Sequence, residues 1–455
     1  MVNKTIAAIA TAQAPAGVGI IRISGAEAKA IASKVFVSRL DKNILNAAGY
    51  SMLYGNICSG EVVLDDAVAL VFTAPKSYTG EDVVELSCHG GMYNLQRVLH
   101  LVLEAGASLA EAGEFTKRAF LNGKLALNQA EAVMDLISAQ NEQALRLANA
   151  SREGALNLKL NKIKAALLDL TAKLAVWADY PEDDIDELEN ERLLEALQLQ
   201  REELLALLAT YKTGKLIAQG IGAVILGKPN VGKSTLMNLL SGCARSIVTD
   251  IPGTTRDIVE EAVNLGDITL RIADTAGIRE TDDPVESLGV ELALKKLESA
   301  DLVLAVFDNS QPLGKEDFEL LKKLKGKNAI AILNKSDVSQ IVSRETIWEY
   351  GLKTVEISAL SWDPLEALQA AVRDCFNGLQ LNPSAGVLAN ERQYEAVGSA
   401  LAAVEEALAA AECGFTLDAI TVSLEGTLAA LYELTGERAS EQIVNQIFEK
   451  FCVGK

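Results

Sequence analysis

Gly227-Lys228-Pro229-Asn230-Val231-Gly232-Lys233-Ser234 is the stretch that decides the fold of the middle of this chain. It follows an apolar run at 222–226 that predicts a strand, and it opens a predicted helix at 233–240. The pattern GxxxxGK[ST] in this setting is typical of a P-loop, because glycines let backbone N–H groups curl around phosphate oxygens. Lys233 is expected to neutralise phosphate charge and the Ser234 hydroxyl to hold Mg²⁺.

Two motifs further along the chain assign the nucleotide. Asp274-Thr275-Ala276-Gly277 ends a predicted strand at 268–273, where an Asp can hold the Mg²⁺ shell and a Gly amide can contact the γ-phosphate. Asn334-Lys335-Ser336-Asp337 ends another predicted strand. The Asp337 carboxylate can accept hydrogen bonds from guanine N1–H and N2–H₂, which adenine does not offer on that edge. The nucleotide is therefore predicted to be GTP.

The remaining nucleotide contacts are expected from a first switch at 253–257 and from a loop at 358–360 that backs the base. Ile278 stands where Ras-type GTPases place a Gln, and Ile cannot orient a water molecule. The candidates for that role are Arg279, Glu280, Asp282, Asp283 and Glu286. The predicted GTP-binding residues are Asn230, Val231, Gly232, Lys233, Ser234, Thr235, Thr249, Asp250, Ile251, Pro252, Gly253, Thr254, Thr255, Asp274, Thr275, Ala276, Gly277, Asn334, Lys335, Asp337, Ser358, Ala359 and Leu360.

Composition limits what else the chain can be. Its 455 residues suggest about three domains, and 49% hydrophobic content is enough for real cores. The 42 Lys+Arg against 62 Asp+Glu give a net charge of -20, so an RNA partner must meet a local basic patch. Six scattered cysteines without a CxxC pair argue against a structural zinc site and favour a reduced, cytoplasmic protein. No apolar run approaches the length of a membrane helix, so no membrane association is expected.

The composition of the sequence and the spacing of its apolar residues change along the chain. Residues 1–119 mix short β-rich runs with helical stretches and predict an α+β domain. Residues 120–214 and 381–455 are rich in Ala and Leu at helical spacing, and they predict a helical domain in two parts. Between them, 215–380 alternates strands and helices, as a parallel sheet covered by helices does. The predicted fold class is multidomain, with an α+β N-terminal domain, a discontinuous α-helical domain and an inserted Ras-like α/β P-loop G domain.

Several motifs outside the P-loop carry a resemblance. They are the switch GTTRD at 253–257, DTAGIR at 274–279, GIIRISG at 19–25, YTGED at 78–82, ELSCHGG at 85–91, GEFTKRAFLNGK at 113–124 and FCVGK at 451–455. Together with Asn230 in the P-loop, they resemble the MnmE (TrmE) family of tRNA modification GTPases over essentially the whole chain. The Era and Der GTPases share the G domain but lack the N- and C-terminal motifs.

The resemblance implies a function for the N-terminal domain. In this family the domain binds a tetrahydrofolate derivative, 5-formyl or 5,10-methylene, and forms the homodimer. The matching folate contacts are Arg22, Glu85, Lys124 and Lys455, for each of which the alternative is a surface ion pair. Cys452 matches a thiol at the folate site, and its alternative is a small buried hydrophobe.

For the G domain the resemblance implies a K⁺ ion, which would neutralise charge on the β- and γ-phosphates. Glu286 matches the family's water-orienting glutamate, so the predicted catalytic residues are Glu286, Lys233 and Cys452. The predicted metal ligands are Asn230, Thr249, Ile251 and Thr254 for K⁺, and Ser234 and Thr255 for Mg²⁺.

The expected function is modification of the wobble uridine (U34) of tRNA at C5 together with the flavoprotein MnmG (GidA), which carries FAD. The product would be an aminomethyl or carboxymethylaminomethyl group, and the one-carbon unit would come from the folate. The alternative is a regulatory P-loop GTPase in ribosome assembly or RNA binding, without modification chemistry. A scaffold with a degenerate nucleotide site is a third possibility, which the presence of Lys233, Ser234, Asp274 and Asp337 argues against.

Overall fold

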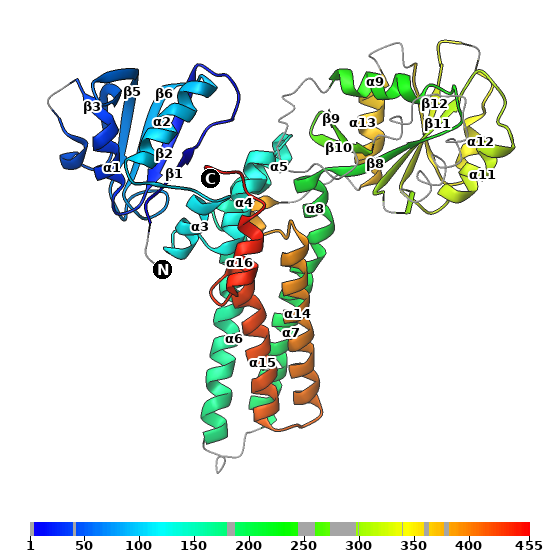
Figure 1. The fold of residues 1–455 in the computed structure, drawn as a ribbon. Helices are drawn as coiled ribbons and strands as arrows, with labels where there is room; N and C mark the ends of the chain where they lie inside the picture. The colour runs from blue at the N-terminus through cyan, green and yellow to red at the C-terminus, as the bar shows by residue number, and fades with distance from the viewer. Residues whose placement is uncertain are drawn as a thin grey trace. The chain divides into compact units, whose positions relative to one another are not determined.

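The structure is a computed structural model (Figure 1), and it describes residues 4–39, 42–179, 187–243, 260–273, 297–298, 300–338, 340–358, 364–376 and 382–455. The chain forms two compact units. The first contains residues 1–134, 152–204 and 395–455, and the second contains 135–151 and 205–394. Among the described residues, no helix is both long and apolar enough to cross a membrane.

The first unit begins with a seven-stranded sheet in the order β3-β4-β5-β6-β2-β1-β7. Its pairs are antiparallel apart from β1 with β7. Helices α1 and α2 pack on one face and share its hydrophobic core. The strands and helices are β1 (Ile6–Ile9), β2 (Val18–Ser24), α1 (Ala28–Val35), β3 (Phe36–Ser38), η1 (Ile44–Asn46), β4 (Ser51–Ser59), β5 (Val62–Phe72), β6 (Val83–His89), α2 (Met92–Glu104) and β7 (Ser108–Leu109).

The helical part of the first unit brings together distant parts of the chain. Helix α6 packs along α15, and its inward positions Leu156, Leu160, Ile163 and Leu167 are buried, as the predicted spacing of apolar residues requires. Its helices include α3 (Glu114–Leu121), α6 (Ala155–Asp179), α15 (Leu417–Thr435) and α16 (Glu441–Phe448). Four others contain a boundary between the units: α4 (Leu127–Ser138), α5 (Glu142–Arg152), α7 (Glu187–Ala209) and α14 (Glu391–Glu412).

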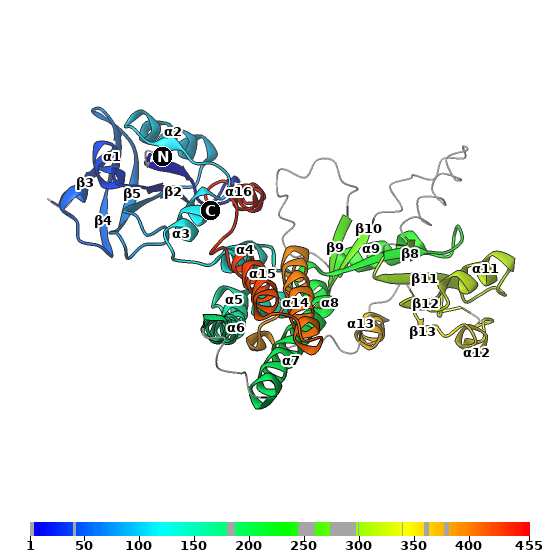
Figure 2. The same ribbon diagram turned by 90° about the horizontal axis from the view of Figure 1, so that it is seen from below.

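The second unit holds a six-stranded sheet in the order β13-β12-β11-β8-β10-β9, parallel apart from β9 with β10. Helices α9 and α13 cover one face, and α11 and α12 cover the other (Figures 1 and 2). The predicted fold class is confirmed. The elements are α8 (Tyr211–Gln219), β8 (Ile221–Leu226), α9 (Lys233–Cys243), β9 (Glu260–Leu265), β10 (Ile268–Ala273), β11 (Leu302–Asp308), α11 (Lys315–Leu324), β12 (Ala329–Asn334), α12 (Arg344–Trp348), β13 (Lys353–Glu356), α13 (Pro364–Cys375) and η3 (Pro383–Ala385).

Candidate functional site

The predicted P-loop connects the carboxyl end of β8 to the first turn of α9. Its backbone turns through positive φ at Gly227, Asn230 and Gly232, with angles of 151°, 63° and 99°. The Lys233 amine donates hydrogen bonds to the carbonyl oxygens of Gly227 and Lys228 at 2.9 and 2.6 Å. Lys233 thus lies inside the curve of the loop, where a phosphate would meet both its charge and the helix N-terminus.

The predicted base-reading motif is hydrogen-bonded to the P-loop. Asn334, with only 2% of its surface exposed, donates from Nδ2 to the carbonyl oxygen of Val231 at 2.8 Å. A Cβ on Gly232 would lie 2.0 Å from that Nδ2, so the close approach of the two loops requires glycine there. The segments that follow β8 and β12 therefore meet at the carboxyl ends of the parallel strands, which is where such folds bind ligands.

Two side chains of the predicted recognition loop, Lys335 and Asp337, follow the end of β12. Asp337 is exposed, so its carboxylate can meet a base. The Lys335 amine lies 2.5 Å from Oδ2 of Asp308 at the end of β11. Burial opposes ionisation of Asp308, but hydrogen bonds from Lys335 and Ser310 hold its pKa below the usual value. Asp308 is therefore an ionised anchor for the loop that carries Asp337.

The exposed hydroxyls of Ser234 and Thr235 open α9, and the exposed Asn230 precedes them. Together with Lys233, this donor set fits a nucleotide phosphate with Mg²⁺ at Ser234. Ser358 is buried and is the last described residue of the loop that follows β13. The remaining predicted residues lie outside the described part of the chain: Thr249, Asp250, Ile251, Pro252, Gly253, Thr254, Thr255, Asp274, Thr275, Ala276, Gly277, Glu286, Ala359 and Leu360. The switches and most of the K⁺ ligands therefore stay predictions.

One contact of the P-loop was not predicted. The Lys228 amine lies 2.6 Å from Oδ2 of Asp317, whose residue surface is 7% exposed. The same oxygen accepts the backbone N–H of Gly314 at 2.8 Å at the start of α11. Asp317 therefore connects the P-loop to the start of α11. The sequence gives only one sign of this contact, which is an Asp in the first turn of a helix.

The first unit contains a second cluster of charged residues. Arg22 on β2 lies opposite Glu85 on β6, and its Nε donates to Oε1 of Glu85 at 2.7 Å. Arg22 also donates from Nη1 to the carbonyl oxygen of Gly454 at 3.3 Å. The guanidinium carbon lies 5.8 Å from the ring centroid of Tyr78 and 5.5 Å from that of Phe115. Sheet register and aromatic contacts therefore fix Arg22 beside the end of the chain.

The C-terminal segment lies against the start of α3 in both views (Figures 1 and 2). The backbone N–H of Gly113 donates to the carbonyl oxygen of Cys452 at 3.3 Å, and that of Phe115 donates to the main-chain oxygen of Lys455 at 3.1 Å. Cys452 is half-buried. The last residues are thus tied down against the N-terminal domain rather than frayed.

Lys455 completes this cluster. Burial and the charge of Arg22 lower the pKa of its amine, while Glu85 opposes the change. No carboxylate of the described residues forms an ion pair with Lys455. Arg22, Lys455 and Glu85, with the Tyr78 and Phe115 rings beside Arg22, can bind an aromatic ligand that carries carboxylates.

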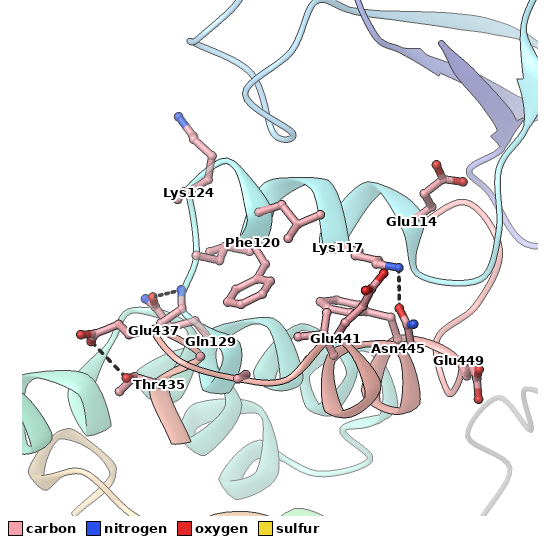
Figure 3. Close-up of a pocket in the computed structure, with 18 of the residues that line it drawn as sticks. Glu114, Lys117, Phe120, Lys124, Gln129, Thr435, Glu437, Glu441, Asn445 and Glu449 are labelled. Atoms are coloured by element: carbon pink, nitrogen blue, oxygen red, sulfur yellow. Dashed lines mark hydrogen bonds between the residues drawn. The ribbon is translucent and has the colours of Figure 1, made fainter. Parts of the chain in front are cut away.

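The structure brings Arg22, Glu85 and Lys455 together but places Lys124 elsewhere. Lys124 donates to the carbonyl oxygen of Pro75 at 3.1 Å. It lies at a cavity of about 1190 Å³ between α3 and α16, which none of the other three lines (Figure 3). In that cavity Lys117 donates to Oδ1 of Asn445 at 2.7 Å. A folate contact at Lys124 stays a prediction.

Comparison with known proteins identifies the family. Residues 5–124 match the family described as the N-terminus of the GTP-binding protein TrmE, and residues 127–452 match the MnmE helical domain. The tRNA modification GTPase MnmE of Clostridioides difficile is 42% identical over 457 residues, which cover 100% of both chains. The chain belongs to the MnmE family.

Other relatives agree with this assignment. The MnmE proteins of Thermoanaerobacter sp. and Geobacillus kaustophilus are each 42% identical, over 461 and 460 residues that cover 100% and 99% of both chains. All three relatives are named tRNA modification GTPases, so the predicted resemblance to the MnmE family and the predicted enzyme class are confirmed. The match includes the N-terminal domain and the helical domain as well as the P-loop region.

Proposed function

We propose that this MnmE-family protein is the GTP-hydrolysing component of the machinery that modifies C5 of the wobble uridine (U34) of tRNA. It acts with the flavoprotein MnmG, which carries FAD, and adds an aminomethyl or carboxymethylaminomethyl group. The observation that carries the proposal is the match over the whole chain to proteins named tRNA modification GTPases. The proposal places the protein in the cytoplasm, with domains at 1–119, 120–214, 215–380 and 381–455.

In the G domain, Lys233 and the P-loop amides bind the phosphates and Ser234 holds Mg²⁺ with Thr255. Asp337 and Asn334 select guanine, because only guanine offers two donors to a carboxylate on that edge. Bound K⁺, held by Asn230 with switch residues, supplies positive charge near the phosphates. Glu286 orients the attacking water, the task that Ile278 cannot perform. The exposed Asn230 and the position of Lys233 support this half of the proposal.

In the N-terminal domain, Glu85 accepts hydrogen bonds from the amino and ring N–H groups of a reduced pterin. Arg22 and Lys455 bind carboxylate or lactam oxygens. The predicted folate contact of Lys124 stays part of the proposal, although Lys124 lines a different cavity here. The folate supplies the one-carbon unit, and Cys452 acts next to it. The proximity of the Arg22 guanidinium, which together with burial lowers the pKa of the Lys455 amine, supports an anionic ligand.

We propose that the same domain forms a homodimer. Its sheet leaves large apolar side chains on β3 and β4 exposed, with 56% of Val37, 69% of Met52 and 41% of Tyr54 accessible. An apolar sheet face of this kind favours burial against another protein surface.

The test is reconstitution with purified MnmG, FAD, tRNA, GTP, K⁺ and methylenetetrahydrofolate, followed by mass spectrometry of the tRNA nucleosides. We expect the modified nucleoside with the wild-type protein, none with Lys233→Ala, and strongly reduced product with Arg22→Ala. Arg97→Ala, an exposed arginine on α2, is the matched control. GTP hydrolysis without any modified nucleoside would favour the regulatory GTPase instead.

A further inference from the structure

The second unit has a groove that the proposed chemistry does not use. Its volume is about 570 Å³, and Val303 and Asn328 at the amino ends of β11 and β12 line it. The P-loop lies at the carboxyl ends of the strands, so the groove is at the opposite edge of the sheet. Its lining includes Tyr211, Lys212, Lys215, Lys327 and Tyr394.

The groove is basic in a protein whose net charge is -20. Lys212, Lys215 and Lys327 are all exposed, and the Lys327 amine donates to a neutral carbonyl oxygen, that of Leu297 at 2.9 Å. Two acids, Asp301 and Glu298, also line the groove, so its three lysines exceed its acids by one charge. It is therefore a local basic patch of the kind that an RNA partner of an acidic protein requires.

Aromatic rings stand among these lysines. Tyr211 and Tyr394 stack with ring centroids 4.4 Å apart and an interplanar angle of 25°. The Lys215 amine lies 5.7 Å from the centroid of Tyr211, and 42% of Tyr394 remains exposed. A rigid, exposed ring beside cations is a platform on which an unpaired base can stack while the lysines bind its phosphates.

The charge continues beyond the groove. Lys322, Lys323 and Lys325 are exposed at the end of α11 and immediately after it, a few residues before Lys327. A single nucleotide would occupy only the groove, whereas a strand could follow this run of lysines. The extended distribution of charge therefore favours a polynucleotide over a mononucleotide.

We propose that this groove binds a single-stranded segment of the tRNA substrate, with a base on Tyr394 and phosphates on Lys212, Lys215 and Lys327. The inference rests on the proposed function, because that function makes tRNA the substrate. It gives the acidic chain a defined place of contact with RNA, at the edge of the G domain away from the nucleotide.

The experiment measures binding of fluorescently labelled tRNA to the full chain by anisotropy at several salt concentrations. The double variant Lys212→Glu/Lys215→Glu should bind at least about tenfold more weakly. The slope of its log K against log salt should become shallower by about 1.4, since each lost phosphate contact to a single strand removes about 0.7. Tyr394→Ala should weaken binding about tenfold and Tyr394→Phe should not, because Phe keeps the stacking surface. GTP hydrolysis without tRNA should remain at the wild-type rate for all variants.

The matched control is Lys162→Glu/Lys450→Glu, which makes the same change of charge at two exposed lysines of the first unit. If the groove double variant binds tRNA as the wild type does, or the control loses as much affinity, the proposal is overturned. If the wild type still modifies tRNA in either case, the proposed function survives. A wild-type protein that neither binds nor modifies tRNA overturns both. If Tyr394→Ala does not fold, as judged by circular dichroism, the lysine variants decide.

Discussion

Replacing Gly454 by Ala tests whether the end of the chain forms part of the Arg22 site. Gly454 has φ of 99°, and a Cβ there would lie 2.3 Å from the carbonyl oxygen of Ile9. The backbone conformation alone costs an L-residue about 1–2 kcal/mol. The collision is with backbone, so the segment must move, and a flexible side chain cannot relieve it.

Moving the segment breaks hydrogen bonds that hold it. These are the contact from Arg22 to the oxygen of Gly454 at 3.3 Å and that from Phe115 N–H to the oxygen of Lys455 at 3.1 Å. At about 1 kcal/mol each, their loss and the backbone cost together weaken docking of the tail by about 3–4 kcal/mol. That corresponds to a shift of more than about 100-fold toward the undocked tail.

The assay is a calorimetric titration of the full-length variant with 5-formyltetrahydrofolate. We expect a large loss of affinity, because Lys455 leaves the site, and faster hydrogen exchange at the amides of Gly113 and Phe115. GTP hydrolysis should be unchanged, because the P-loop belongs to the other unit.

Gly414→Ala is the control for this prediction. Gly414 also has a positive φ, 69°, but a Cβ there would meet nothing within 4 Å. The Gly414→Ala variant should therefore lose free energy through its positive φ without displacing the C-terminal tail. Folate affinity and amide protection at wild-type levels in Gly454→Ala would refute the inclusion of the tail in the site.

Four further outcomes concern other residues. Asp337→Asn should shift preference from guanine toward xanthine nucleotides in a competition assay, because the amide donates to the carbonyl that replaces N2; unchanged preference contradicts the assignment. Hydrolysis should be faster in K⁺ than in Na⁺, and Glu286→Ala should lower kcat with little change in nucleotide affinity; equal rates in both salts remove the cation mechanism. The hydrogen bond to Asp65 raises the pKa of His89, so Asp65→Asn should lower that pKa in an NMR titration. Stabilisation from His89 protonation is present at low pH and is lost as the pH rises through that raised pKa.

Local signals made much of the second unit predictable. Strand β10 (Ile268–Ala273) begins and ends where its apolar run predicts, because a buried strand needs only a short apolar run bounded by polar or turn residues. The P-loop and the Asn334 motif lie at strand ends as their sequence context predicts. Strand β9 (Glu260–Leu265) was not predicted, since its acidic, alternating sequence at an edge carries a weak signal.

Contacts between distant segments were not predictable in the same way. Nothing in the local sequence of Lys228 points to Asp317, and nothing near Tyr211 points to Tyr394, because each contact depends on how the sheet and helices pack. Arg22 and Glu85 were paired only through the resemblance to the family. Their contact depends on the register of β2 with β6, which a single sequence does not reveal.

The two sites belong to different units, and the chain passes between the units inside helices. Each boundary falls within α4, α5, α7 or α14, as the bounds of those helices and of the units require. A continuous helix keeps its i→i−4 hydrogen bonds across such a boundary, so it bends little over a few turns. Helical backbone therefore joins the two units at each of these boundaries, whereas a flexible linker would absorb a displacement that began in either unit.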